Sequence, residues 1–286
     1  MITDLIEVVI ESSAKLQSTK YYRMPTWYIP HGGGPCFFME WNPPHAWDKM
    51  AFFLKGLSST LPEKPKAIVM ISAHWLEKTI TVTGALNPDL IYDYYGFPEH
   101  TYELKYSAKG DPELAQKIVE VLEVANIPAN IDSTRGFDHG MFIPMMLMFP
   151  NADIPTVQVS LNSNLDPQTQ INLGQALEKL RGQGVLIIGS GMSFHNMRAY
   201  GNPEFRSISD EFDDWLTKTV ESKPQERHQA LIEWANAPSA RLSHPPAQEE
   251  HLLPLMVVAG AASKELGRKV FSDRVLETTI SAYVFG

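Results

Sequence analysis

The sequence predicts a single-domain α/β fold in which helices cover both faces of a central, mostly parallel or mixed β-sheet. Short apolar runs alternate along the chain with longer segments of helical periodicity, which is typical of α/β proteins. Most of these runs are apolar throughout, as in strands whose two faces are both buried. The 286 residues, 44% of them hydrophobic, suffice for a large core, and no repeat or shift in composition marks a second domain.

Four apolar runs are expected to form the buried strands, and three of them lead into a histidine. The runs and their histidines are residues 27–29 with His31, residues 67–72 with His74, and residues 185–188 with His195. The fourth run, residues 156–161, alternates in polarity and stops at Asn162. Residues 278–285 also alternate, which favours a strand that closes the sheet.

Helices are expected between these runs. Asp111 and Asp166 each precede a proline at the first helical position, and an apolar stripe follows, so each predicts the start of a helix. The helix after Asp166 should extend to Gly182. A methionine-rich helix is expected over residues 141–149, and another over residues 250–262, with Pro254 in its first turn.

Composition excludes several classes of function. The net charge is −9 and no basic stripe occurs, which argues against binding to nucleic acid or to an anionic membrane surface. No apolar run approaches the roughly 20 residues of a membrane span. The first residues are expected to be a helix or arm rather than a signal peptide, because acidic side chains interrupt their apolar ones. With one cysteine, no disulfide within the chain is possible, so a cytoplasmic location is expected.

The nine histidines carry the main functional signal, because a metal in this chain would be bound through imidazole and carboxylate groups. Loops at the C-terminal edge of an open α/β sheet converge on ligands, so His31, His74 and His195 are expected to lie together. Glycines beside His31 and His195 allow a close backbone approach. At His251, which follows two glutamates, either the imidazole or a neighbouring carboxylate is a candidate ligand.

Competing interpretations of these residues are weaker. The glycines do not form the GxxxxGK[ST] pattern of a phosphate-binding loop. Cys36 has no specified base, and Ser190 lacks the GxSxG context of a hydrolase nucleophile. Structural roles are expected for four histidines: His45, His100, His228 and His244.

Seven motifs occur in an order that resembles a known family. They are His31-Gly32-Gly33-Gly34-Pro35, Ser72-Ala73-His74-Trp75, Gly96-Phe97-Pro98, Gly110-Asp111-Pro112-Glu113-Leu114-Ala115, Gly136-Phe137-Asp138-His139-Gly140, Gly189-Ser190-Gly191 with His195-Asn196, and Glu249-Glu250-His251-Leu252-Leu253-Pro254-Leu255. The pattern resembles the class III extradiol ring-cleavage dioxygenases of the LigB-like superfamily, and within it the DOPA 4,5-dioxygenase branch. The resemblance implies an N-terminal extension over residues 1–24 and a catalytic domain over residues 25–286.

The resemblance also implies a non-haem Fe(II) enzyme that inserts both atoms of O2 into a catechol. Its metal ligands would be His31, His74 and His251, with His195 as the acid/base residue or a fourth ligand, and His139 as a second catalytic histidine. Protocatechuate-type relatives complete their site with a carboxylate, so Glu250 is an alternative ligand. Zn(II) could occupy the same site. Both a monomer and a homodimer remain open.

Further roles follow from this interpretation. Asp138 and Glu249 are expected to orient an imidazole, and Trp75 and Phe97 to pack on the substrate ring. Cys36 is expected at the mouth of the site, where oxidation is a hazard. Two other functions compete: a zinc hydrolase that uses the same histidines, and a non-enzymatic binding protein of the Memo type.

Overall fold

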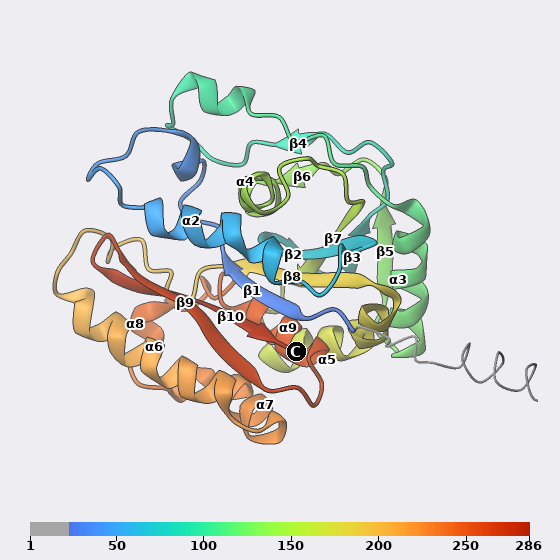
Figure 1. Ribbon diagram of the computed structural model, residues 1–286. Coiled ribbons are helices and arrows are strands. Elements are labelled where there is room, and N and C mark those ends of the chain that lie inside the picture. Colours follow the sequence, from blue (N-terminus) through green and yellow to red (C-terminus); the bar gives the residue numbers. More distant parts are fainter. Residues whose placement is uncertain (1–22) are drawn as a thin grey trace, which may run out of the picture.

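An eight-stranded mixed sheet organises the computed structural model, which describes residues 23–286 (Figure 1). The strand order is β5-β3-β7-β2-β8-β1-β10-β9. The bounds are β1 Thr26–Pro30, β2 Ala67–Glu77, β3 Ile80–Thr83, β5 Ala129–Asp132, β7 Thr156–Asn162, β8 Val185–Gly191, β9 Gly267–Val275 and β10 Thr278–Phe285. Two short strands, β4 (Leu90–Ile91) and β6 (Phe137–Asp138), form a separate parallel pair.

The centre of the sheet is parallel and is flanked on both sides by antiparallel pairs, although the edge strand β5 pairs parallel with β3. Strands β7, β2, β8 and β1 run in one direction, whereas β10 pairs antiparallel with both β1 and β9, and β3 pairs antiparallel with β7. The predicted fold, a mostly parallel or mixed sheet, is therefore confirmed.

Helices cover both faces of this sheet (Figure 1). Alternate residues of β2 enter different cores, with Val69 and Ile71 on one face and Ile68 and Met70 on the other. The first core includes α3 (Pro112–Val124), α5 (Pro167–Leu177), α6 (Phe205–Glu221), α7 (Pro224–Ile232) and α9 (Leu253–Ala261). The second includes α2 (Asp48–Leu57) and α4 (His139–Met148). A short helix, α8 (Ala240–Ser243), lies against α6.

The predicted helix starts are confirmed where a side chain caps the helix. The carboxylate of Asp111 accepts a hydrogen bond from the Leu114 amide, and that of Asp166 accepts one from the Thr169 amide. The second helix is α-helical only to Leu177, and its last turns are 3₁₀. The helix expected over residues 250–262 begins later, at Leu253, although Pro254 does lie in its first turn.

Strand β2 is longer than predicted. The sequence places its end at Ser72, but the strand continues to Glu77. Its pairing with β8 stops at Ser72, and its register with β7 shifts between Ile71 and Leu76. The irregular segment between Ile71 and Leu76 carries His74. A bulge within the strand, rather than the end of the strand, therefore exposes this residue.

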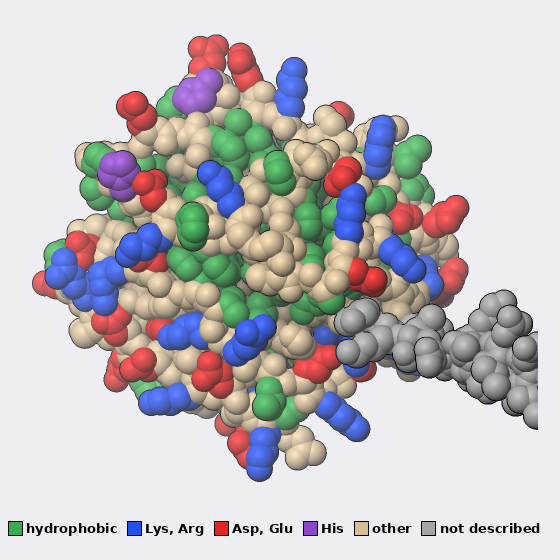
Figure 2. Space-filling model, in the orientation of Figure 1, with side chains coloured by type: hydrophobic (Ala, Val, Ile, Leu, Met, Phe, Trp, Pro, Cys, Tyr) green, Lys and Arg blue, Asp and Glu red, His purple; other side chains and the backbone are tan. Residues whose placement is uncertain are grey.

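The predicted N-terminal extension, residues 1–24, falls almost wholly outside the described residues. Within residues 23–286, no helix is long and apolar enough to cross a membrane. Acidic and basic side chains are interspersed on the face shown in Figure 2. This face therefore carries no basic stripe of the kind that nucleic acid binding requires.

Candidate metal centre

Five histidines from five segments meet at the C-terminal ends of the central parallel strands. His31 directly follows β1, His74 lies in the irregular part of β2, and His139 is the first residue of α4. His195 follows β8, and His251 lies in the turn before α9. The structure thus brings together all five histidines that the sequence nominated.

The imidazoles lie within contact distance of one another. The Nε2 atoms of His31 and His74 are 3.2 Å apart, and the ring of His251 is centred 5.2 Å from that of His31 and 4.9 Å from that of His74. The rings of His74 and His139 are centred 4.0 Å apart. Potential ligand atoms fall into two groups, each within 4.8 Å: His31, His74 and His139, and His195, Glu250 and His251.

Burial favours the neutral form of four of these rings, those of His31, His74, His195 and His251. It lowers the pKa of His31, His74 and His251 well below the usual value, and the neighbouring imidazoles lower each further. Burial alone lowers the pKa of His195 to about 4. Neutral imidazoles keep the lone pair that a metal needs, so this donor set fits a first-row metal such as iron or zinc.

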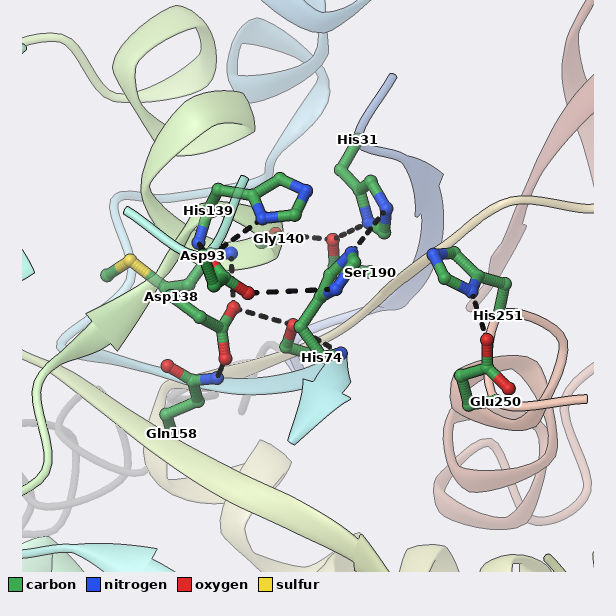
Figure 3. A network of polar contacts seen from close by, with 12 residues as sticks. His31, His74, Asp93, Asp138, His139, Gly140, Gln158, Ser190, Glu250 and His251 are labelled. Carbon is green, nitrogen blue, oxygen red and sulfur yellow. Dashed lines mark hydrogen bonds and ion pairs between the residues drawn. The ribbon is translucent and has the colours of Figure 1, made fainter. Parts of the chain in front are cut away.

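His31 is held by a hydrogen-bond chain from β8 to α4 (Figure 3). Ser190 donates its hydroxyl proton to the carbonyl of Gly140, so its oxygen can only accept from His31 Nδ1, 3.0 Å away. The proton of His31 therefore lies on Nδ1, and the lone pair of Nε2 faces His74.

Carboxylates anchor two further rings. The backbone amide and Nδ1 of His139 both donate to Oδ1 of Asp93, at 2.9 and 2.8 Å, and the other oxygen of Asp93 lies 3.7 Å from His74 Nδ1. Burial raises the pKa of Asp93, but the hydrogen bonds and charge of His139 outweigh it and hold that pKa below the usual value. His251 Nδ1 lies 3.0 Å from Oε1 of Glu250, on the side turned away from His31 and His74 (Figure 3).

The residues expected to orient imidazoles do something else. The buried carboxylate of Asp138 accepts hydrogen bonds from Ser72, Gln158 and the Met141 amide, so it caps α4 and ties that helix to β2. Glu249 pairs with Arg241. Sequence reasoning missed Asp93, which lies in a loop with no local motif that points to it.

Glycines let the backbone segments of the site approach closely. A Cβ on Gly191, at the end of β8, would overlap the carbonyl oxygen of His251. A Cβ on Gly140 would overlap the Ser72 hydroxyl and lie 3.0 Å from a ring carbon of His74. Only glycine fits at these two positions without moving a segment that carries a histidine.

A cavity of about 350 Å³ opens beside the histidines, within the range of small-molecule sites. Besides the five histidines, its lining residues are Gly32, Gly33, Gly34, Trp41, Trp47, Tyr94, Tyr95, Phe97, Met197, Tyr200 and Leu276. Phe97 thus lines the cavity as expected. Trp75 does not, because it is buried elsewhere under the guanidinium of Arg135.

The expected position of Cys36 is also wrong. Its side chain is buried beneath Gly32 and does not line the cavity beside the histidines. Burial raises the pKa of its thiol, so the reactive thiolate is disfavoured. His244 is likewise buried away from the cavity, where its Nε2 donates to the carbonyl of Ser193.

The chain resembles known proteins over most of its length. The family model described as the catalytic LigB subunit of aromatic ring-opening dioxygenase matches residues 25–286. Dioxygenase tasH of Hapsidospora irregularis is 39% identical over 94% of this chain and 87% of its own. Two proteins named 4,5-DOPA dioxygenase extradiol also match. That of Beta vulgaris is 38% identical over 84% of this chain and 87% of its own. That of Escherichia coli K12 is 35% identical over 91% of this chain and 90% of its own.

A solved structure has the same fold. The crystal structure of the uncharacterized protein JW3007 from Escherichia coli K12 superposes with a TM-score of 0.71 at 31% sequence identity. The similarity covers 92% of this chain and all of the other chain.

Proposed function

The chain belongs to the LigB family of aromatic ring-opening dioxygenases, and from this premise we propose that it opens the ring of a catechol beside its two hydroxyl groups, using Fe(II) and both atoms of O2. One observation carries the proposal. Three neutral imidazoles, those of His31, His74 and His251, converge beside a cavity of small-molecule size; two are buried and that of His74 is half-buried.

We propose these three histidines as the metal ligands. Hydrogen bonds at Nδ1 of His31 and His251 leave Nε2 of each ring free for a metal. Bound Fe(II) supplies open positions for the two catechol oxygens and for O2, and a path for electron density between them. Glu250 supports this set better as an anchor of His251 than as a ligand, because it lies on the far side of that ring (Figure 3).

We assign proton transfer to His195. The ring lines the cavity, and burial holds its pKa at about 4, so it is a neutral base when substrate arrives. It accepts a proton from a catechol hydroxyl and returns it later in the reaction. Its proximity to Glu250 and His251 is also compatible with a fourth-ligand position.

His139 has a different role in this proposal. Its Nδ1–H is committed to Asp93, so Nε2 is the nitrogen available to the cavity. From there it positions a substrate hydroxyl or stabilises negative charge that develops on oxygen.

Family membership favours this function over the two competing ones. A zinc hydrolase would use the same imidazoles to activate water, and Zn(II) remains compatible with the donor set. A non-enzymatic binding protein would not need five histidines beside a cavity. Neither alternative has an observation of its own in its favour.

The decisive experiment compares metals. Protein reconstituted with Fe(II) should consume O2 and produce a yellow ring-opened product with at least one member of a broad catechol panel. Protein loaded with Zn(II) should do neither, and anaerobic ester or amide hydrolysis should be absent from both. If the iron form consumes no O2 across the panel, the proposed function is wrong.

The ligand set is tested by metal retention. His74→Ala should abolish metal retention. Glu250→Gln should retain one metal per chain, with its affinity for the metal weakened by about 10- to 100-fold. If Glu250→Gln loses metal as completely as His74→Ala does, Glu250 is a ligand.

A further inference from the structure

The lining of the cavity beside the histidines has two chemically different parts. The five imidazoles, which pack against one another, make up one part of the lining. The remaining walls come from segments far apart in sequence and carry aromatic and aliphatic side chains: Trp41, Trp47, Tyr94, Tyr95, Phe97, Met197, Tyr200 and Leu276. The imidazoles suit the two hydroxyls of a catechol, and the aromatic and aliphatic side chains are available to the substituent on its ring.

One wall is a set of aromatic rings that pack on one another. Trp41 lies edge-on to Trp47, with ring centres 5.4 Å apart, and tilted against Phe97 at 6.3 Å. Phe97 lies edge-on to Tyr94 at 5.5 Å, and Tyr94 lies edge-on to His139 at 5.6 Å. These contacts fix the rings relative to the histidines, so the wall is formed before substrate binds.

Apolar side chains continue to the mouth. Tyr95 and Met197 are 87% and 67% exposed, although both line the cavity. The hydroxyl of Tyr94 donates to the carbonyl of Thr101, and that of Tyr200 donates to the carbonyl of Phe194, so these two phenol protons are already committed. Within residues 23–286, the lining of this cavity includes no lysine, arginine or carboxylate.

From these walls we infer the class of substrate: a catechol whose ring substituent is uncharged and apolar. The inference rests on the proposed function. An apolar substituent gains by leaving water for the aromatic wall. A carboxylate or ammonium group would lose its hydration there without a charged partner from the described lining.

The test compares catechols that differ in one substituent. On the Fe(II) enzyme, kcat/KM for 4-propylcatechol should exceed that for 3-(3,4-dihydroxyphenyl)propionate and for L-DOPA by at least about tenfold. Anaerobic binding to the same enzyme, followed by tryptophan fluorescence, should give the same order. If L-DOPA or the propionate is preferred, the inference is overturned while the proposed function stands.

The binding measurement distinguishes a failure of the proposed reaction from a failure of the inferred substrate class. If no catechol is turned over but 4-propylcatechol still binds preferentially, the proposed reaction fails and the cavity's preference stands. If all three bind equally, the inference fails whatever the turnover.

A charge placed at the mouth gives a matched second test. Met197→Lys offers an ammonium partner, so it should narrow the preference for 4-propylcatechol over the propionate by about fivefold or more. Leu266→Lys adds the same charge at a position that is 61% exposed and outside the cavity lining, and it should leave the ratio unchanged. Equal ratios in the two variants would show that the substituent does not lie against this wall.

Discussion

The ring of His195 lies parallel to that of His251, with centres 3.5 Å apart and planes inclined by 12°. His195 Nδ1 is buried without a hydrogen-bond partner among the described residues, whereas His251 Nδ1 is anchored by Glu250. The two stacked rings are therefore held differently. One is fixed as a ligand would be, and the other is free to exchange a proton.

This difference predicts the effect of His195→Gln. Glutamine has no basic nitrogen, so kcat of the iron enzyme should fall by about 10²- to 10⁴-fold, the usual contribution of a general acid/base. The metal content should stay at the wild-type level, because the three proposed ligands remain. Metal analysis and O2 uptake on the same preparation check both points. A fully active variant would contradict the acid/base role, and loss of metal would indicate a fourth ligand.

Asp93 should act by orienting His139. In Asp93→Asn, one acceptor oxygen is replaced by an amide nitrogen and the negative charge beside two imidazoles is lost, so activity should fall by about 10- to 100-fold. Asp89→Asn, just before β4, is the matched control, because Asp89 uses its backbone carbonyl to accept from Phe137. The pH profile of kcat should change in Asp93→Asn alone. Equal profiles in the two variants would mean that Asp93 only stabilises the fold.

The sequence predicts those parts of the fold and site that depend on local chemistry. Asp111 and Asp166 are recognisable caps because the capping bond spans three residues. The convergence of His31 and His195 follows from strands that run parallel and end at one edge.

Other features depend on contacts that sequence patterns do not record. The bulge that places His74 within β2 arises from the register with β7, a strand whose paired residues lie 85 to 88 positions further along the chain. Asp93 reaches His139 across 46 positions, and Trp41 meets Phe97 across a similar gap. The glutamates before His251 suggested a helix start, but the first helical residue is Leu253, so Glu250 lies in a turn where it can bend back to His251.

Gly191→Ala should loosen the turn that carries His251. The added Cβ would overlap the carbonyl oxygen of His251, and overpacking of this kind costs about 1–3 kcal/mol of folding free energy. Because the displaced segment holds a proposed ligand, metal affinity should fall together with stability. Gly182→Ala is the control, since a Cβ there meets nothing within 4 Å. Thermal unfolding and metal titration of both variants check this, and wild-type affinity in Gly191→Ala would contradict it.

His244 should make the metal-free protein sensitive to acid. Burial, which is the main cause, lowers its pKa from 6.5 to about 3, while its Nε2 donates to Ser193. Between these two pH values the unfolded chain binds a proton at this site and the folded protein does not. The contribution of this site to the free energy of unfolding is therefore at its maximum above pH 6.5. It falls by about 1.4 kcal/mol per pH unit as the pH drops towards 3.

His244→Gln removes this proton uptake but keeps a side-chain donor for Ser193. Urea unfolding of chelated protein at pH 7.5 and pH 4.5 should show that the wild type loses about 2–3 kcal/mol more than the variant between the two conditions. The other buried histidines are present in both proteins, so their contribution cancels in the difference. His45→Gln, which removes a surface imidazole, serves as the control. An equal loss in the wild type and His244→Gln would show that His244 is not what couples folding to pH in this range.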